Sequence, residues 1–586
     1  MTGLTFTSVL LAGLTLGAVT AGAGERVPLW PEGRIPGFEA HQFAAPNDEV
    51  QKPGFRSEEH RMPYLEWMDP PAASNAHGGV ILLIPGGGYF GCYSVQLTKQ
   101  WHRFFTDSGF QCVRLVYRTP RTRDGIYYRA AWQDGQRAVR LVRAEARRRG
   151  LDPARIGATG MSAGGHLTML LATRSLTPAY EPVDAVDAEP CSIDFAMPGA
   201  VPYGLADSVG TPSTRNGNGI DCGFVGDFAF DAKTPPTCLF HGGSDHYAPE
   251  HSTKLYRELR KRKIPSELHL YADSGHGDFW SRDWADSAAG FIRQMNLDRR
   301  LGAPVALATR WPKDAQGIAP ERQELWPKDR TPDVQTNQCR PYLEWWVPAQ
   351  LRTKAVQIVY SGGGYNDNHP ESWDGVPEAR RFLNERGMAV VVLKYRTPRP
   401  KGGLAKHTTA WQDLQRCVRL VRQGAESRGL DPRRIGILGG SAGGHLTLMG
   451  ATSSRSRSYW DVDAADKLPC DVQWAVATYP AYALTDGVNG PNAGGGNDDA
   501  ARLVPEFAFD LSTCPILFLH GDADGYAAMN SVKCWEQLRR MGVQGELHTF
   551  AKCEHCFMIK APEGTGAYRW LDRIWSFLEH KGFVRD

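Results

Sequence analysis

The feature that most constrains the fold is an internal repeat that runs through most of the 586-residue chain. Repeats have to be identified before single motifs are weighed, because they set the number of structural units. Trp411 follows Trp132 at the same distance along the chain as Ser441 follows Ser162. The motifs that recur in the same order are PYLEW (63–67 and 341–345), GGGY (86–89 and 362–365), YRTP (117–120 and 395–398) and SAGGH (162–166 and 441–445).

The repeat predicts two copies of one domain, which span residues 27–301 and 323–586. Residues 302–322 lie between them, and the proline and glycine of the polar segment 311–320 are typical of a linker. We expect each copy to be self-contained, with all the residues that its own site needs. The oligomeric state stays open.

An apolar run near the start of the chain indicates a signal peptide. Residues 9–19 are apolar, and the small residues 21–23 resemble a cleavage site. We therefore predict that residues 1–23 are removed and that the protein works in the periplasm or outside the cell. Because no Lys or Arg precedes the run, a buried N-terminal strand is the alternative.

Composition excludes several classes of function. The chain has 67 Lys and Arg against 64 Asp and Glu, without a sustained basic run, which excludes a dedicated nucleic-acid-binding protein. Its 42% hydrophobic residues are enough for a core in each half. No other stretch approaches the roughly 20 apolar residues of a membrane span. The 12 cysteines are too few for a disulfide framework, although export would permit one or two bridges, whose pairing stays open.

The hydrophobic pattern alternates between strand-like and helix-like segments in each half. Residues 80–84 and 111–117 are short apolar runs that predict buried strands. Residues 130–149 predict an amphipathic helix, whose arginine-rich face we expect to be solvated. A strand at 156–159 and a turn at 160–165 precede an apolar helix that begins near residue 166. This alternation favours a mostly parallel, doubly wound sheet flanked by helices in each half.

Two serines have the surroundings of a catalytic nucleophile. Ser162 and Ser441 each occupy the centre of a G-x-S-x-G motif between a predicted strand and a predicted helix. A serine in such a turn projects its oxygen above the sheet, and the glycines relieve the crowding of the turn.

A serine hydroxyl is a weak nucleophile and needs a base that a third group orients. The predicted bases are His276 and His555, and the predicted orienting acids are Asp245 and Asp524. All four follow strand-like runs, and their spacing from the serines is the same in both halves. Asp522 competes with Asp524, but it aligns with a glycine in the first half, which cannot serve as an acid.

Backbone amides that could bind an oxyanion follow from the glycine runs and the serine turns. A glycine loop after a strand can present N–H groups to the carbonyl oxygen, and so can the residue after the nucleophile. A plain turn is the alternative interpretation. The predicted oxyanion donors are Gly87, Gly88 and Ala163 in the first half and Gly363, Gly364 and Ala442 in the second.

Other polar residues of the repeated motifs have structural interpretations. We expect His166 and His445 to pack at helix starts, because they point away from the nucleophile turn. The repeated motifs also predict two structural ion pairs, Arg118 with Asp134 and Arg396 with Asp413.

The cysteine spacing disfavours a zinc site. Cys553 and Cys556 form a C-x-x-C motif, but no second cysteine pair at zinc-finger spacing accompanies them. Tyr89, Tyr247 and Trp280 lie next to predicted site loops, where they could stack on a sugar ring or simply line a pocket.

These motifs resemble those of the α/β-hydrolase esterases grouped with acetylxylan esterases and feruloyl esterases. The resemblance rests on residues 85–89, 117–118, 162–167 and 275–277 and on the turn at Asp245. It implies two tandem α/β-hydrolase domains that hydrolyse carboxyl esters, commonly acetyl groups on plant polysaccharides such as xylan, without a metal or an organic cofactor. The partner would be an acylated polysaccharide or oligosaccharide. Pro85 and Ser361 replace a histidine that is frequent before the glycine loop in the wider fold.

Two other functions compete with an esterase. A serine peptidase of the prolyl-oligopeptidase type shares the Ser-Asp-His order, but no segment has room for the large all-β domain of that group. A carbohydrate-binding or scaffolding protein with an inactive hydrolase domain is the second alternative, which the complete triads disfavour.

The residues around the two histidines predict unequal sites. Gly275 and Gly277 flank His276, whereas Glu554 and Cys556 flank His555. If the Glu554 carboxylate faces the imidazole it favours the protonated ring. In the alternative, Glu554 points to solvent and both sites work equally. Because the turn after Asp524 also lacks the stiffening proline of the first half, we expect the N-terminal site to be faster near neutral pH.

Overall fold

The computed structural model describes most of the chain outside its N-terminus, the predicted linker and a few loops. The predicted signal peptide and most of the predicted linker lie outside the described residues. We call 24–298 the N-terminal half and 317–585 the C-terminal half. The described stretches are 24–37, 62–74, 76–92, 95–120, 126–205, 222–223, 225–298, 317–485 and 501–585.

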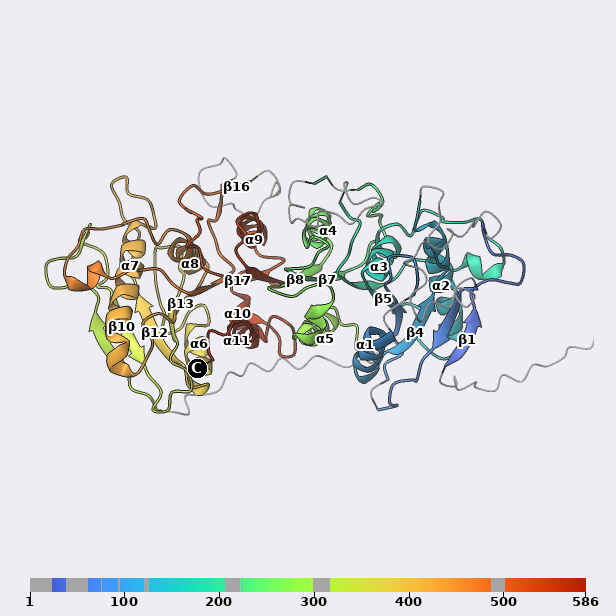
Figure 1. Cartoon of the computed structure of the whole chain (residues 1–586), viewed down its shortest axis with the longest axis horizontal. Coiled ribbons are helices and arrows are strands. Elements are labelled where there is room, and N and C mark those ends of the chain that lie inside the picture. Colours follow the sequence, from blue (N-terminus) through green and yellow to red (C-terminus); the bar gives the residue numbers. More distant parts are fainter. Residues whose placement is uncertain are drawn as a thin grey trace, which may run out of the picture.

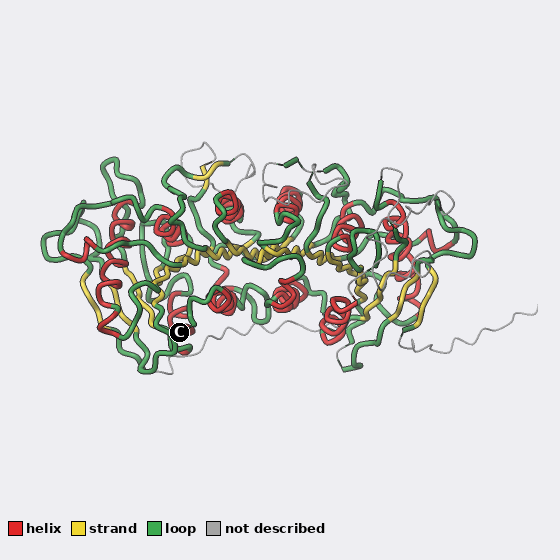
Figure 2. The backbone as a smooth tube through the Cα atoms, viewed as in Figure 1, coloured by secondary structure: helices red, strands yellow, loops and turns green. Residues whose placement is uncertain are grey.

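One sheet runs through both halves of the described chain, as Figures 1 and 2 show. Its strand order is β1-β2-β4-β3-β5-β6-β7-β8-β18-β17-β14-β13-β11-β12-β10-β9, so the order read inward is equivalent from either end. The strands of the N-terminal half are β1 (Glu25–Pro28), β2 (Tyr64–Trp67), β3 (Val80–Ile84), β4 (Gln111–Val116), β5 (Ile156–Met161), β6 (Phe195–Gly199), β7 (Thr237–Gly242) and β8 (Ser266–Tyr271). Those of the C-terminal half are β9 (Glu321–Glu324), β10 (Tyr342–Trp346), β11 (Val356–Tyr360), β12 (Ala389–Lys394), β13 (Ile435–Gly440), β14 (Trp474–Thr478), β17 (Ile516–Gly521) and β18 (Gly545–Phe550). A separate pair joins β15 (Leu484–Thr485) to β16 (Arg502–Leu503).

Helices cover both faces of this sheet (Figure 2). One face carries α2 (Arg129–Arg148), α3 (Ala163–Thr173), α4 (Glu250–Lys261), α7 (Thr408–Gly424), α8 (Ala442–Thr452) and α9 (Met529–Arg540). The other carries α1 (Val95–Asp107), α5 (Trp284–Gln294), α6 (Val376–Glu385), α10 (Phe557–Lys560) and α11 (Trp570–His580). Short 3-10 helices are η2 (Ala185–Ala188), η5 (Asp278–Ser281), η6 (Glu426–Arg428) and η7 (Ala464–Lys467). None of the described helices has both the length and the apolar composition that crossing a membrane requires.

The prediction of two separate sheets is wrong, because the last strand of each half pairs with its counterpart. Strands β8 and β18 are antiparallel neighbours, with His269 opposite His548. Within each half the central strands are parallel, and only the outer strands run antiparallel. A sheet that ended at β8 would present unpaired backbone N–H and C=O groups, and the second half satisfies them. The fold is therefore an α/β fold with one large, mostly parallel mixed sheet.

The predicted elements agree closely with the structure, apart from their ends. The helix after Ser162 begins at Ala163, immediately after the serine, whereas the sequence predicted a start near residue 166. Strand β1 begins at Glu25, two residues before the predicted domain start, and β9 crosses the predicted boundary at 323. No disulfide joins two cysteines in the described part of the structure, so the bridges that export would permit are not seen there.

Part of the arginine-rich face of α2 is buried, which corrects the expectation of a solvated face, although Arg129, Arg147 and Arg148 are exposed. Arg137 is 3% exposed, and its guanidinium binds Asp187 at 2.9 Å and Asp184 at 2.6 Å. Asp184 caps the start of η2, Asp187 lies within η2, and η2 contacts α2. Periodicity alone could not reveal this, because the carboxylates come from about 50 residues further along the chain.

A row of four buried acid and imidazole groups crosses the seam between β8 and β18. His269 and His548 share a hydrogen bond of 2.9 Å between their Nδ1 atoms. Their Nε2 atoms lie 3.0 Å from Glu267 and 3.1 Å from Glu546. Burial raises the pKa of Glu267 to about 8. Burial also raises the pKa of Glu546, but Arg282 and His548 outweigh it and bring the value to about 2.

Because the pKa of Glu267 is raised and that of Glu546 is lowered, Glu267 is protonated and Glu546 is ionised at neutral pH. Each of the three hydrogen bonds in the row then has one proton. Protonated Glu267 donates to His269 Nε2, and His269 Nδ1–H donates to His548. His548 Nε2–H then donates to the Glu546 carboxylate, which Arg282 also contacts at 3.2 Å. The seam therefore holds one net negative charge in this row, which an arginine balances.

The free energy of unfolding is expected to fall as the pH rises from about 4.5 to about 8, because unfolding then releases the Glu267 proton. A Glu267→Gln variant keeps a neutral side chain and should lack this contribution. Denaturant unfolding at pH 5, 6.5 and 8 should show the variant gaining stability relative to the unmodified protein as the pH rises. Glu546→Gln is the matched control and should show no such gain. Parallel pH curves for Glu267→Gln and the unmodified protein would contradict the protonated Glu267.

Candidate active site

Each repeated serine lies in a tight turn between a strand and a helix. Ser162 joins β5 to α3 with a φ of 57°, and Ser441 joins β13 to α8 with a φ of 58°. This left-handed backbone is uncommon for residues with side chains and aims the hydroxyl away from the sheet. The glycines are needed here, because a Cβ on Gly160 would lie 2.4 Å from the carbonyl oxygen of Gly164. The structure thus contains the predicted strand–turn–helix in both halves.

The structure brings each predicted aspartate to its predicted histidine. His276 Nδ1 lies 2.8 Å from Asp245 Oδ2, and His555 Nδ1 lies 2.8 Å from Asp524 Oδ2. The aspartates follow β7 and β17, and the histidines follow β8 and β18. Since neighbouring parallel strands end at the same edge of a sheet, the four loops deliver these groups to the edge where the serine turns lie.

The contact between serine and histidine differs between the halves. His555 Nε2 and Ser441 Oγ share a hydrogen bond of 2.8 Å, so Ser441, His555 and Asp524 form a continuous row. Among the described contacts, no hydrogen bond joins Ser162 to His276, although Ser162 is buried beside the same kind of loop. Such hydrogen bonds are often long in ligand-free sites and shorten when substrate binds.

A second, buried histidine supports each aspartate, and the sequence analysis missed both. His241 Nε2 lies 3.3 Å from Asp245 Oδ2, and His520 Nε2 lies 3.4 Å from Asp524 Oδ2. Burial raises the pKa of Asp245, but its contacts with His241 and His276 lower it below the usual range. The same balance brings the pKa of Asp524 to about 2. Both carboxylates therefore stay ionised at neutral pH. The repeated His-Gly pair at the end of β7 and β17 was the available signal.

The turns that carry Asp245 and Asp524, which we call the acid turns, have matching geometry. Tyr247 N donates to Asp245 at 2.8 Å, and Tyr526 N donates to Asp524 at 2.7 Å. The expected loosening of the second turn is not visible in these bonds. Asp522, the competing acid, does not contact His555 among the described hydrogen bonds and instead faces the N-terminal half.

The glycine loops lie against the serine turns. A Cβ on Gly86 would lie 3.2 Å from Ser162 Cβ, and one on Gly362 would lie 2.7 Å from Ser441 Cβ. The loops take up left-handed backbone at Gly87, Gly88, Gly363 and Gly364. Ala163 and Ala442 are the first residues of α3 and α8, where helix N–H groups have no partner within the helix. Of the six predicted oxyanion donors, Ala163 and Ala442 directly follow the serines, and the four glycines lie in the loops whose first residues, Gly86 and Gly362, pack against the serines.

A tyrosine of the YRTP motif fixes the start of each glycine loop. Tyr117 OH donates to Pro85 O at 2.9 Å, and Tyr395 OH donates at 2.9 Å to the carbonyl oxygens of Ser361 and Gly362. Both rings are buried. The sequence signal for this contact was the recurrence of the tyrosine beside the arginine in both halves, although no role was predicted for it.

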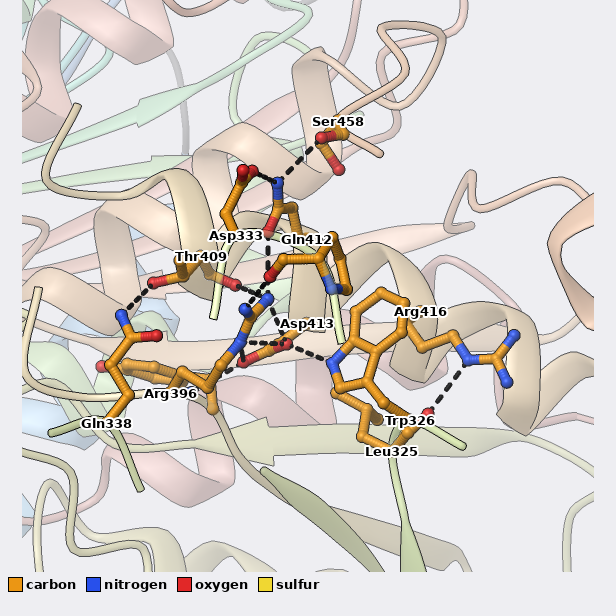
Figure 3. Close-up of polar contacts among 12 residues, drawn as sticks. Leu325, Trp326, Asp333, Gln338, Arg396, Thr409, Gln412, Asp413, Arg416 and Ser458 are labelled. Carbon is orange, nitrogen blue, oxygen red and sulfur yellow. Dashed lines mark hydrogen bonds and ion pairs between the residues drawn. The ribbon is translucent and has the colours of Figure 1, made fainter. Parts of the chain in front are cut away.

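The predicted ion pairs are confirmed, and the arginine of each pair directly follows this tyrosine in the chain. Figure 3 shows the pair of Arg396 and Asp413. Arg396 Nε lies 3.0 Å from both carboxylate oxygens of Asp413, and both side chains are fully buried. Trp326 Nε1 also donates to Asp413 at 2.7 Å, which ties the start of the half to α7. Arg118 and Asp134 repeat the arrangement with Trp30. These pairs therefore position the glycine loop indirectly and do not form part of the reacting set.

Asp374 is the main feature of the C-terminal site that the sequence analysis missed. Its carboxylate is 6% exposed and accepts hydrogen bonds from Gly362 N and, at 3.1 Å, from Tyr479 OH. Cys556 Sγ lies 3.8 Å away. One carboxylate therefore connects the glycine loop, the loop after β14 and the histidine loop. The N-terminal half has Ala200 where the repeat places Tyr479 and Gly277 where it places Cys556, so the motif comparison gave no signal.

Glu554 does not approach the imidazole, which matches the alternative in which it points to solvent. Its side chain is exposed, and no described hydrogen bond or ion pair joins it to His555. The extra negative charge near the second serine comes from Asp374 instead. Proximity along the chain could not reveal this carboxylate, because Asp374 lies about 180 residues before His555.

His166 and His445 pack at the helix starts, as predicted. Burial lowers the pKa of His166 to about 3, and burial also lowers that of His445. Their Nδ1 atoms bond to the hydroxyls of Tyr89 at 2.7 Å and Tyr365 at 2.8 Å.

The three aromatic residues proposed to bind sugar differ in what the structure permits. Tyr89 is 1% exposed, so its ring is not available for stacking, which corrects that alternative. Tyr247 is half-buried, with its ring 5.1 Å from that of His276. The side chain of Trp280 lies outside the described part of the structure.

Possible cation ligands gather at three places among the described residues. The sets are Cys238, Glu267 and His269; Asp245, His246 and His276; and His407, His445 and Glu506. The first belongs to the seam row and the second to the acid–histidine pair, whose atoms already have partners. Cys553 and Cys556 belong to none of the three sets.

Comparison with known proteins adds to this geometry. The sequence profile of the BD-FAE family matches residues 68–196 and 343–537, which together exceed half of the chain. An acetylxylan esterase of Xylanibacter ruminicola is 35% identical over 349 residues, 53% of this chain and 68% of that protein. An endo-1,4-beta-xylanase B of Butyrivibrio fibrisolvens is 26% identical over 209 residues, 34% of this chain. The match spans only 32% of the xylanase.

Solved structures match about half of the chain each. An acetyl ester-xyloside bifunctional hydrolase from Caldicellulosiruptor lactoaceticus is 25% identical, with a TM-score of 0.37. The match covers 45% of this chain and 97% of the hydrolase chain. The apo form of Thermogutta terrifontis esterase 2 is 20% identical, with a TM-score of 0.36, and covers 47% of this chain and 98% of its own.

Proposed function

Because the chain belongs to the BD-FAE family and is an acetylxylan esterase-like carboxylesterase, we propose that it removes acetyl groups from acetylated xylan. We propose further that it is a tandem duplication with one catalytic site in each half, bounded by the predicted domains 27–301 and 323–586. Export to the periplasm or beyond would bring such an enzyme to its polysaccharide.

The contact that carries the proposal is the row formed by Ser441, His555 and Asp524. In the proposed reaction Ser441 O–H donates to His555 Nε2, and the serine oxygen attacks the ester carbonyl. His555 gives the proton to the sugar oxygen as the bond between that oxygen and the acyl carbon breaks, and water then releases acetate from the acyl-enzyme. Asp524 accepts from His555 Nδ1 throughout and stabilises the charged ring.

The N-terminal half offers the same groups in the same register. Asp245 and His276 are already joined, and a hydrogen bond from Ser162 to His276 would complete the row. The N–H groups of the glycine loop and of Ala163 or Ala442 would hold the oxyanion. Tyr247, whose ring lies 5.1 Å from that of His276, is placed to contact a sugar ring in this half.

Acetate release from a panel of acetylated glycans tests the substrate. We expect the highest kcat/KM on acetylated xylan, lower values on acetylated mannan or pectin, and no cleavage of a prolyl peptide anilide. Rapid cleavage of the anilide would favour the peptidase alternative. Binding of xylan without any acetate release would favour the scaffold alternative, and a higher value on another glycan would reassign the substrate.

The N-terminal site is expected to supply most of the rate at neutral pH, so Ser162→Ala should remove more activity than Ser441→Ala. The reason is the Asp374 carboxylate, whose charge beside the second glycine loop opposes a developing oxyanion. In the Ser162→Ala background, Asp374→Asn should therefore raise the remaining hydrolysis of nitrophenyl acetate about 10-fold. Asp367→Asn, an exposed aspartate of the same loop, is the control.

The difference between the two sites and the role of Asp374 can be tested separately. Equal losses from the two serine variants would remove the difference between the sites. A lower rate in the Asp374→Asn variant would show that the carboxylate holds the loops in their working geometry.

A further inference from the structure

The two halves exchange contacts next to their acid turns, beyond the pairing of β8 with β18. Helices α4 and α9 lie side by side on one face of the sheet (Figure 1), where Arg257 and Glu536 form an ion pair of 3.1 Å. Each helix also carries an arginine at the equivalent position, Arg260 on α4 and Arg539 on α9. Each of these arginines crosses the seam.

Arg260 reaches the acid turn of the C-terminal half. Its guanidinium lies 2.9 Å from Asp522 Oδ1 and also donates to the Asp522 carbonyl oxygen. Tyr256, one helical turn earlier, donates its hydroxyl to Asp522 Oδ1 at 2.7 Å. Asp522 lies two residues before Asp524, so α4 of one half holds the turn that carries the acid of the other.

Arg539 reaches the acid turn of the N-terminal half. It donates to the carbonyl oxygen of Gly243 at 2.9 Å and pairs with Glu250, a fully buried carboxylate, at 3.2 Å. Gly243 lies two residues before Asp245 and is the counterpart of Asp522. Because Gly243 has no side chain, Arg539 binds the backbone of the turn directly.

Each acid turn is wedged against the loop that carries its histidine. A Cβ on Gly242 would lie 2.3 Å from Ser274 O, and one on Gly521 would lie 2.2 Å from Cys553 O. Ser244 N donates to Ser274 O at 2.9 Å, which joins the turn to the histidine loop. A shift of the turn therefore changes the distance between the carboxylate and the imidazole.

We propose that each half positions the acid of the opposite site, with Arg539 and Arg260 as the positioning residues. The two sites are then not self-contained, contrary to the expectation from the repeat. The inference rests on the proposed function in one respect, that the aspartates serve serine–histidine pairs.

Labelling of the intact protein with a fluorophosphonate tests the crossed arrangement, because mass spectrometry reports both serines in one molecule. Arg539→Ala should lower the labelling rate of Ser162 about 10-fold and leave that of Ser441 unchanged. Arg260→Ala should do the reverse. Arg540→Ala, at the exposed next position of α9, is the control and should change neither rate.

Two further readouts separate positioning from a general loss of stability. In the Arg539→Ala variant Asp245 is expected to move away from His276 and no longer to favour its charged imidazole. The pH below which the labelling of Ser162 slows should therefore shift to a lower value. Arg539→Lys should restore part of the rate, because the ammonium group can still donate to Gly243 O.

Equal losses at both serines, or a loss at the serine of the mutated half alone, would overturn the inference. An unchanged labelling pattern in both arginine variants would do the same. If neither serine of the unmodified protein were labelled, the proposed serine chemistry itself would be wrong, which is a distinct outcome.

Discussion

Replacement of both Ser162 and Ser441 by alanine is expected to lower ester hydrolysis by about 10⁴-fold or more. Each serine supplies the only nucleophile of its site in the proposed mechanism, and alanine can form no acyl-enzyme. The glycine loops and helix N-termini remain, so a small residual acceleration over water is expected. Nitrophenyl acetate hydrolysis and acetate release from xylan measure the loss.

The serine substitutions should leave the fold intact, which the melting temperature checks. A double variant of Ser108→Ala with Ser427→Ala is the matched control. Ser108 bonds to the backbone at the end of α1, and Ser427 is exposed in η6, so neither approaches a site. Retention of most activity in the Ser162 and Ser441 double variant would refute both triads.

Substitution of Asp245 by asparagine, in the Ser441→Ala background, is expected to lower kcat by roughly 10⁴-fold. The carboxylate accepts from His276 Nδ1–H and so leaves the Nε2 lone pair free to take the serine proton. An asparagine amide can donate to Nδ1 and would stabilise the wrong tautomer. The charge of Asp245 is firmly maintained, because its contacts with His241 and His276 keep its pKa below the usual range.

Asp231→Asn provides the control for that experiment. Asp231 accepts from Leu176 N at 2.8 Å in a loop of the same half and has no contact with the acid turn among the described bonds. Asparagine can accept the same hydrogen bond. A loss of less than 10-fold in the Asp245→Asn variant would mean that another group orients the base.

The local parts of the site could be predicted because the repeat tested each motif twice. The turns at Ser162 and Ser441 follow from strand, glycine and helix signals within a dozen residues. The choice of Asp524 over Asp522 rested on register alone, and the structure agrees, since Asp524 reaches His555 while Asp522 binds Tyr256.

The parts that could not be predicted depend on contacts between distant segments. The Asp374 carboxylate belongs to a loop without a counterpart in the repeated motifs. The burial of Arg137 depends on aspartates that come after α3. The pairing of β8 with β18 has no sequence signal at all, because buried central strands and buried edge strands have the same hydrophobic pattern.

The antiparallel contact between β8 and β18 has the form of an isologous contact between two subunits of a two-fold dimer. In this chain the two partners are covalently tethered, so their association does not depend on protein concentration. The specific activity of the intact chain should therefore stay constant on dilution. A pair of separately expressed halves would have to find each other by diffusion, and their activity would fall once the concentration dropped below their dissociation constant.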